Sequence, residues 1–167
     1  MKILGIDPGL ATVGYGVIDY IDNNKISLID CGIISTDANT PFPERLRQIE
    51  QGIIELIDSF MPNAVAFEEL FFNKNVKTAL QVAHARGVAL LAAYGRTKEL
   101  YEYTPLQVKQ AVVGYGRADK NQVQQMVKIM CNLTEVPKPD DAADAVAIAI
   151  CHAHSSFNNY SSDTKIK

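Results

Sequence analysis

Apolar runs in the first part of the chain predict strands. Residues 2–7 form a short apolar run that ends in Asp7 before a proline-glycine pair, which indicates a buried strand that stops at a turn. Stretches rich in β-branched and aromatic residues, at about 12–20 and 25–35, flank a polar turn as the two arms of a hairpin do. We therefore expect three consecutive antiparallel strands, with Asp7 at the end of the first.

A helix and a fourth strand are predicted next. Between Pro43 and Met61, apolar residues recur at steps of three and four and so share one helix face. They are Leu46, Ile49, Ile53, Leu56, Ile57 and Phe60. Residues 64–68 are again a short apolar run that ends in an acid. Because a helical crossover joins this strand to the first, the two are expected to be parallel, with the end of the second beside Asp7.

The second half of the chain is predicted to be mainly helical. The expected elements are an alanine-rich helix at about 75–95, a short strand near 100–103, and helices that begin at Thr104-Pro105, at Asp119 and at about Asp140. Proline suits the first turn of a helix, and the spacing of Asp119 and Gln122 fits a capping box. The last helix is expected to end near His154.

These elements predict an α/β fold in which helices flank a mixed five-stranded sheet. No second set of strands and no internal repeat is visible, so residues 1–155 are expected to form a single domain. Residues 156–167 are mostly polar and are expected to form a flexible tail.

Composition narrows the class of protein. With 47% hydrophobic and 21% charged residues, the chain can bury the core of a globular domain. Apolar runs stay well short of the roughly 18 residues that span a membrane, and Asp7 stands where a signal peptide would continue apolar. We expect a cytoplasmic protein without a membrane association. The three cysteines are widely spaced, which indicates small buried apolar residues and not a zinc site.

Charge is distributed unevenly along the chain. The net charge is −3, yet residues 71–130 carry 9 basic and 3 acidic side chains, whereas residues 1–70 carry 4 basic and 11 acidic ones. A basic stretch between acid-rich ends suits a surface that binds phosphates and presents them to a carboxylate site. Charge alone is equally compatible with a solvated helix face that carries lysines.

The start of the last predicted helix brings two acids to one side. Asp141 and Asp144 are three residues apart and Ile148 continues the same stripe, so both acids are expected to face the body of the protein. Like charges that are close and partly buried raise each other's pKa and are costly unless a cation compensates them. Carboxylates without a histidine or thiol partner select hard cations such as Mg²⁺ or Mn²⁺.

Each acid has a structural explanation when it is taken alone. Asp140 is expected only to cap the helix, Asp7 could form an Asx turn, and Glu68 or Glu69 could be solvated at a strand end. The predicted fold, however, brings the ends of the first and fourth strands to the edge that the last helix can cover. This joint placement favours a site for paired metal ions, which suits phosphodiester hydrolysis.

A series of short motifs runs through the chain in a fixed order. They are Gly5-Ile6-Asp7-Pro8-Gly9, Gly14-Tyr15-Gly16, Phe67-Glu68 leading to Phe71, Lys74-Asn75, Ala85-Arg86-Gly87-Val88-Ala89, Gln107-Val108-Lys109-Gln110, Val112-Val113-Gly114, Lys120 and Asp141-Ala142-Ala143-Asp144-Ala145. Their order and spacing resemble those of the bacterial RuvC Holliday junction resolvases over about residues 2–154. The resemblance implies an RNase H-like fold, a homodimer, and two Mg²⁺ ions per subunit, which Mn²⁺ can replace. It implies four catalytic, metal-binding acids and selects Glu68 over Glu69; the acids are Asp7, Glu68, Asp141 and Asp144.

The same resemblance implies contacts with DNA. Lys109 and Lys120 would contact phosphates near the scissile bond, and Phe71 would stack on a base at the junction crossover. Phe71 and Phe72 could equally be core residues. The basic stretch and its glycine-rich loop supply the other expected DNA contacts, Lys74, Lys77 and Arg117. The implied partners are four-way junction DNA and the RuvA–RuvB branch-migration complex, and the implied function is the resolution of Holliday junctions in recombination and repair by paired, symmetric cuts.

Three other functions share parts of this pattern. An ATPase of the actin and sugar-kinase kind also ends its first strand in an aspartate, but it needs two lobes and this length provides one. A nuclease acting on RNA hybrids or ribosomal RNA precursors could use the same scaffold. A binding module that has lost catalysis is disfavoured because all four acids are present. No role is assigned to the histidines, since a helix histidine is more often structural; they are His84, His152 and His154.

Overall fold

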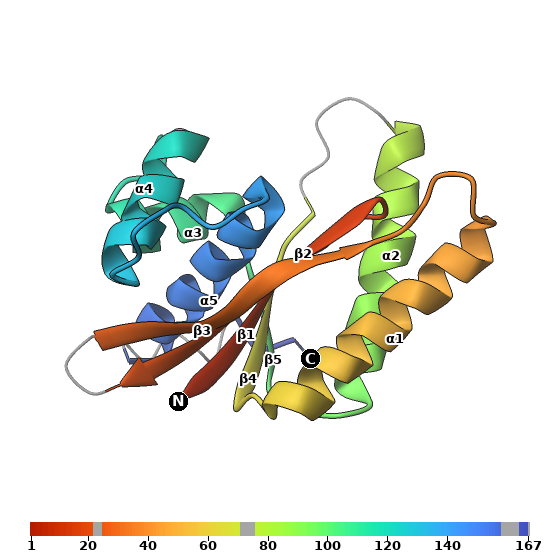
Figure 1. The fold of residues 1–167 in the computed structure, drawn as a ribbon, viewed down its shortest axis with the longest axis horizontal. Helices are drawn as coiled ribbons and strands as arrows, with labels where there is room; N and C mark the ends of the chain where they lie inside the picture. Colours follow the sequence, from red (N-terminus) through yellow and green to blue (C-terminus); the bar gives the residue numbers. More distant parts are fainter. Residues whose placement is uncertain (22–24, 71–75, 158–163, 167) are drawn as a thin grey trace.

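The computed structural model describes residues 1–21, 25–70, 76–157 and 164–166, apart from the side chains of residues 76–78 and 157. A five-stranded sheet lies between two groups of helices (Figure 1). The strands are β1 (Lys2–Asp7), β2 (Thr12–Ile21), β3 (Lys25–Ser35), β4 (Ala64–Glu68) and β5 (Leu100–Tyr103). The helices are α1 (Phe42–Phe60), α2 (Val76–Tyr94), α3 (Pro105–Val113), α4 (Lys120–Met130) and α5 (Asp140–Phe157).

The sheet has the strand order β3-β2-β1-β4-β5. The first three strands pair antiparallel, and β4 pairs parallel with both β1 and β5. The predicted mixed sheet, the hairpin and the parallel fourth strand are therefore confirmed. Because β1 and β4 run in the same direction in the middle of the sheet, the acids that end them lie at the same edge.

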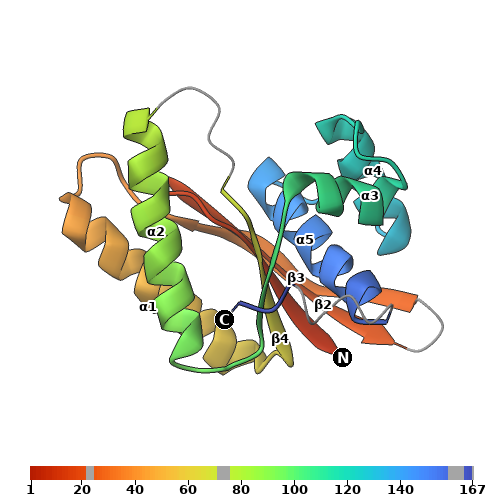
Figure 2. The same cartoon turned by 180° about the vertical axis from the view of Figure 1, so that it is seen from behind.

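Alternate residues of β1 face opposite sides of the sheet. Leu4 and Ile6 belong to the core beneath α1 and α2, whereas Ile3 belongs to the core beneath α3, α4 and α5. Figure 2 shows the two helix groups from behind, with α1 and α2 on one side of the sheet and α5 on the other. Gly5 also lies against α5. The alternation therefore places Asp7 on the face that α5 covers.

Two glycines of the sheet allow α5 to pack very close to it. A Cβ atom on Gly5 would lie 2.1 Å from the carbonyl oxygen of Ala145, and one on Gly14 would lie 2.1 Å from that of Asp141. Real Cβ atoms essentially never come within 3.0 Å of another heavy atom. Gly14 is also the antiparallel partner of Asp7 in β2. The first turn of α5 is thus held directly over the end of β1.

Capping boxes fix the starts of the two short helices, α3 and α4. The Thr104 side chain accepts from the backbone N–H of Gln107, and the Gln107 side chain accepts in return from the backbone of Thr104. Asp119 and Gln122 make the same pair of bonds at the start of α4, as the sequence predicts. The loop between the two helices begins at Gly114, which has a φ of 91° and ends α3 in the left-handed conformation.

The C-terminal residues 164–166 lie along the free edge of β5. Lys165 forms an antiparallel bridge with Tyr101, and the backbone N–H of Ile166 donates to the carbonyl of Leu100 at 2.9 Å. Ile166 also packs against the core beneath α1 and α2, so residues 164–166 are held against the domain. Among the described residues, no helix is both long enough and apolar enough to cross a membrane.

Candidate metal centre and its surroundings

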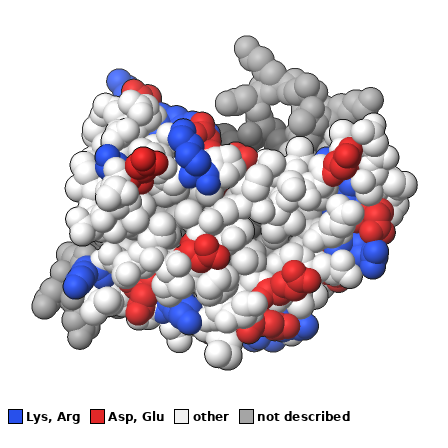
Figure 3. Space-filling view, in the orientation of Figure 1, with Lys and Arg blue, Asp and Glu red and all other residues white. Residues whose placement is uncertain are grey.

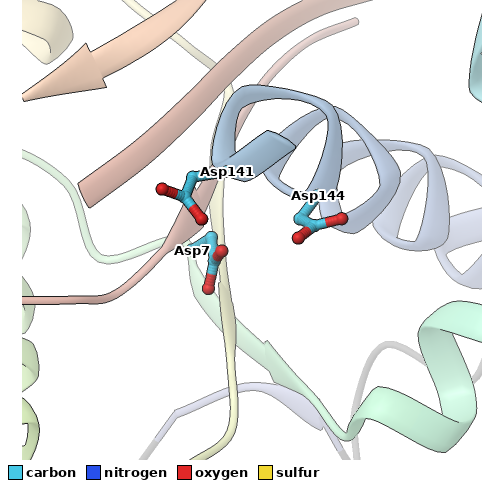
Figure 4. Close-up of side chains that lie close together, drawn as sticks. All are labelled: Asp7, Asp141 and Asp144. Atoms are coloured by element: carbon cyan, nitrogen blue, oxygen red, sulfur yellow. The ribbon is translucent and has the colours of Figure 1, made fainter. Parts of the chain in front are cut away.

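Three aspartates converge at the edge of the sheet where α5 begins. Carboxylate oxygens of Asp7, Asp141 and Asp144 all lie within 4.8 Å of one another. Figure 4 shows Asp7 at the end of β1, next to the start of α5, which carries the other two. Oxygen atoms this close, from three carboxylates, form a set that can bind a divalent cation.

Local structure explains the convergence. Strand alternation turns Asp7 toward α5, and the spacing of three residues places Asp141 and Asp144 on one side of that helix. The hydroxyl of Thr12, at the start of β2, donates to Asp141 Oδ2 at 2.7 Å. This hydrogen bond fixes the Asp141 carboxylate in the neighbourhood of Asp7.

Glu68 reaches the same region from the end of β4. The parallel register pairs Ile6 with Phe67, so Asp7 and Glu68 are the next residues of adjacent strands. Phe67 belongs to the core beneath α1 and α2, which leaves Glu68 on the α5 face and Glu69 on the other. Glu68 is outside the group of three within 4.8 Å, but it lines the adjoining cavity together with Asp144.

A cavity of about 180 Å³ opens beside the aspartates. One end carries acids and lysines, and the rest is apolar and comes from α3, α4 and α5. The lining residues are Glu68, Pro105, Val108, Lys109, Lys120, Val123, Asp144 and Ala147. The capped starts of α3 and α4 thus bring Lys109 and Lys120 to the acidic edge of the sheet.

Burial raises the pKa of two of the acids. Desolvation is the main reason that the pKa of Asp7 rises to about 7, and the charges of Glu68 and Asp144 add to it. Desolvation also raises the pKa of Glu68 to about 7, with Asp144 adding to the rise and Lys109 and Lys120 opposing it. A cation bound among these groups would favour their charged forms and lower both pKa values.

Lys120 makes the closest contact between a base and the acids. Its Nζ lies 2.9 Å from Asp144 Oδ2 and 3.7 Å from Asp140 Oδ2. Asp140 also receives a hydrogen bond from Lys138 at 3.4 Å. Asp140 therefore belongs to an exposed network of charges at the start of α5.

The donor atoms fit a hard cation. Asp7, Glu68, Asp141 and Asp144 offer only carboxylate oxygen, and the described residues bring no histidine or thiol into this group. Four carboxylates at one edge carry a negative charge that the two neighbouring lysines balance only in part. Mg²⁺ and Mn²⁺ are the ions that such a set prefers.

The structure describes only some of the other residues that are expected to contact DNA. Arg117 is exposed in the loop between α3 and α4, and Lys77 lies in the first turn of α2, where side chains are not described. Phe71 and Lys74 lie outside the described residues. Basic and acidic side chains lie next to one another over α4 and the start of α5, above a largely uncharged surface (Figure 3).

Sequence reasoning did not identify Arg86 as a residue of this region. Its Nη2 donates to Glu102 Oε2 at 2.5 Å and its Nε donates to the backbone carbonyl of Glu68 at 3.3 Å. The contact ties α2 to the end of β4. The only signal in the sequence is an arginine within an apolar helix stretch, which does not reveal its partners.

His152 is a core residue. It is 2% exposed, its Nδ1 lies 2.7 Å from the hydroxyl of Tyr103, and burial lowers its pKa to about 4. It is therefore neutral near pH 7 and lies among packed side chains.

Comparisons with known proteins agree with this geometry. A sequence profile of the family described as "Crossover junction endodeoxyribonuclease RuvC" matches residues 3–152. The chain is 59% identical over 167 residues to the crossover junction endodeoxyribonuclease RuvC of Alkaliphilus oremlandii, which covers 100% of both chains. The protein of that name from Alkaliphilus metalliredigens is 61% identical over 155 residues, covering 93% of this chain and 94% of the relative.

Comparison with solved structures also indicates the RuvC family. The structure described as "T. thermophilus RuvC in complex with Holliday junction substrate" superposes with a TM-score of 0.89 at 38% sequence identity, covering 93% of this chain and 94% of that one. The expected RNase H-like fold is thus confirmed. With a profile match over most of its length and relatives more than half identical to it, this chain belongs to the RuvC family of crossover junction endodeoxyribonucleases.

Proposed function

We propose that this protein is an endonuclease that resolves Holliday junctions in DNA recombination and repair by paired, symmetric, metal-dependent hydrolysis of phosphodiester bonds. The observation that carries the proposal is the convergence of Asp7, Asp141 and Asp144 within 4.8 Å, beside a cavity lined by two lysines. Membership of the RuvC family supports the choice of substrate, since a relative is described in complex with a Holliday junction.

The proposed catalytic set consists of four metal-binding acids: Asp7, Glu68, Asp141 and Asp144. Their chemistry fits two Mg²⁺ ions per subunit, with Mn²⁺ as a substitute. When bound, such ions help to deprotonate an attacking water and stabilise the leaving oxygen. Thr12 holds the carboxylate of Asp141 through its hydroxyl, and Arg86 holds the backbone of Glu68.

Lys109 and Lys120 are proposed to bind the DNA phosphates next to the scissile bond. Both line the cavity with Glu68 and Asp144, so a phosphate held by the lysines would lie against the acids. The remaining proposed DNA contacts come from the family resemblance and the basic central segment. They are Phe71, Lys74, Lys77 and Arg117.

The protein is proposed to act as a homodimer, because two symmetric cuts across a four-way junction require two sites related by a two-fold axis. Helix α2 supports this with an exposed apolar row at helical spacing. Leu80 is 57% exposed, Leu91 is 70% exposed and Tyr94 is 54% exposed. An apolar row of this kind is typical of a self-complementary interface. The RuvA–RuvB branch-migration complex is the further partner that the family resemblance suggests.

A competition between substrates tests the proposal. Equal amounts of a four-way junction, a linear duplex and an RNA–DNA hybrid are incubated with the protein in Mg²⁺, and the products are separated on a denaturing gel. We expect cuts at symmetric positions in two opposing junction strands and little cutting of the duplex or the hybrid. Preferential cutting of the hybrid would indicate a nuclease of another kind on the same scaffold.

A further inference from the structure

A second cavity, of about 330 Å³, lies beside the metal centre. It is lined by residues 9–12, which join β1 to β2, by Arg45 of α1, and by Gln81 and Val82 of α2. Thr12 lies between the second cavity and the metal centre, because it lines the cavity while its hydroxyl donates to Asp141. In Figure 1 the loop between β1 and β2 lies beside α2, at the same end of the sheet as the start of α5.

Hydrogen bonds hold Arg45 in this cavity. Its Nε donates to the hydroxyl of Thr36 at 2.8 Å, and that hydroxyl donates in turn to the carbonyl of Leu10 at 2.6 Å. Thr36 is only 8% exposed, so the anchor is buried. The guanidinium is therefore oriented before any ligand arrives, and its two Nη groups are not used by this chain of bonds.

Arg45 differs from Arg47, two residues further along the same helix, in having no acidic partner among the described residues. Arg47 pairs with Glu44 at 2.8 Å, whereas no carboxylate among the described residues lies within ion-pair distance of Arg45. The described residues that line the cavity likewise include no acid. An oriented guanidinium with free donors, in a cavity without negative charge, is suited to a phosphate group.

We propose that this second cavity binds a backbone phosphate of the junction DNA, close to the strand that enters the metal centre. The inference rests on the proposed function, since it takes four-way junction DNA as the substrate. Arg45 is the phosphate ligand, and Gln81 is an exposed residue that lines the same cavity. The contact positions the DNA and takes no part in the chemistry.

The test is equilibrium binding of a four-way junction in EDTA, where no strand is cut, at a series of salt concentrations. Arg45→Gln should bind the junction about tenfold more weakly, and the slope of log K against log salt should fall by about 1, as for the loss of one phosphate contact. Arg47→Gln makes the same change of charge on the exposed side of α1 and should leave both values unchanged. An Arg45→Gln variant with the affinity and salt slope of the wild type would overturn the inference.

A second variant leaves the Arg45 anchor intact. Gln81→Glu places a negative charge in the cavity and should weaken junction binding about threefold or more, whereas Gln51→Glu, an equally exposed change on α1, should have no effect. Unchanged binding by Gln81→Glu would also overturn the inference. A wild-type protein that shows no preference for the junction would contradict the proposed function. A wild-type protein that binds and cuts the junction, together with cavity variants that behave in the same way, would contradict only the inference.

Discussion

Lys120 Nζ lies 2.9 Å from Asp144 Oδ2, so a lysine that is proposed to bind DNA also forms an ion pair with a proposed metal ligand. The hydrogen bond from Lys120 lowers the pKa of Asp144, against the larger rise that burial causes. Because the lysine side chain is 52% exposed, the ion pair adds little to stability. The ammonium of Lys120 and a divalent cation at the proposed site would instead compete for the carboxylate of Asp144.

Replacing this lysine should separate metal binding from DNA binding. Lys120→Gln is expected to bind Mg²⁺ about two- to fivefold more tightly, because a positive charge next to the ion is removed, and to bind junction DNA more weakly. Mg²⁺-dependent thermal stabilisation and junction binding measure the two effects. Lys138→Gln is the control, because Lys138 forms an ion pair with Asp140 alone among the described residues and does not line the cavity. A loss of Mg²⁺ affinity in Lys120→Gln would contradict the competition.

Glu68 and Glu69 provide a matched pair of adjacent acids. Glu68→Gln should lower the rate of junction cleavage by about a thousandfold or more while leaving junction binding intact, because it removes a proposed metal ligand but none of the proposed DNA contacts. Glu69→Gln should cleave at close to the wild-type rate, since Glu69 does not line the cavity. Single-turnover rates of junction cleavage in Mg²⁺ measure the difference between the two variants. Equal rates for the two variants would remove Glu68 from the proposed site.

The raised pKa of Asp7 predicts how stability depends on pH in EDTA. Between about pH 4 and pH 7 the folded protein binds more protons than the unfolded chain, because the pKa of Asp7 rises from 3.8 to about 7 on folding. The contribution of Asp7 to the free energy of unfolding therefore falls as the pH rises through this window and is constant above it. Asp7→Asn removes the effect and should raise Tm at pH 8 by roughly 5 °C relative to wild type, but not at pH 4.

Thermal melts of the two proteins in EDTA at both pH values measure this difference. Asp58→Asn, an exposed acid that pairs with Arg96, is the control and should show no such dependence. Added Mg²⁺ should raise the Tm of the wild type at pH 8 and have little effect on Asp7→Asn. A constant difference between wild type and Asp7→Asn across the pH range would contradict the assignment.

The close approach of α5 to the sheet predicts a large effect of one methyl group. Gly14→Ala would place Cβ 2.1 Å from the carbonyl oxygen of Asp141, so α5 must move away from β2. We expect the free energy of unfolding to fall by about 2 kcal/mol or more, and cleavage to be lost with the displacement of Asp141. Gly95→Ala, whose Cβ would meet no atom closer than 3.4 Å, should do neither. Chemical denaturation and cleavage assays test both variants.

The apolar row on α2 predicts the effect of a charge at the proposed interface. Leu91→Glu should yield monomers in sedimentation experiments, and the remaining cleavage should produce single nicks in place of paired cuts. Ile129→Glu is the control, because Ile129 is similarly exposed, at 66%, but lies on α4. Dimers of normal stability in Leu91→Glu would show that α2 is not the interface.

Much of the proposed site follows from the sequence because it depends on local periodicity. Strand alternation and a helix spacing of three residues are enough to bring Asp7, Asp141 and Asp144 together once the strand order is known. The same alternation distinguishes Glu68 from Glu69, since Phe67 and Ala66 belong to opposite cores. The sequence alone does not reveal which helices cover which face of the sheet, and so the choice of Glu68 over Glu69 depended on the family resemblance.

Other features depend on contacts between distant residues that leave no local signal. The hydrogen bond from Arg86 to the backbone of Glu68 joins a helix to a strand end and depends on the exact packing of α2. The ion pair between Lys120 and Asp144 depends in the same way on how α4 meets α5. The pairing of residues 164–166 with β5 involves only a few residues, so it too leaves no pattern in the sequence.

The short pairing of residues 164–166 with β5 has a consequence for how copies of this protein meet. An uncovered outer strand offers unpaired backbone groups to any extended segment and invites open-ended stacking. Here the chain shields part of that strand with its own end, through the bridge between Lys165 and Tyr101. Contacts between copies through this part of the sheet are thereby disfavoured, which fits the proposed dimer through α2, where a two-fold arrangement would close on itself.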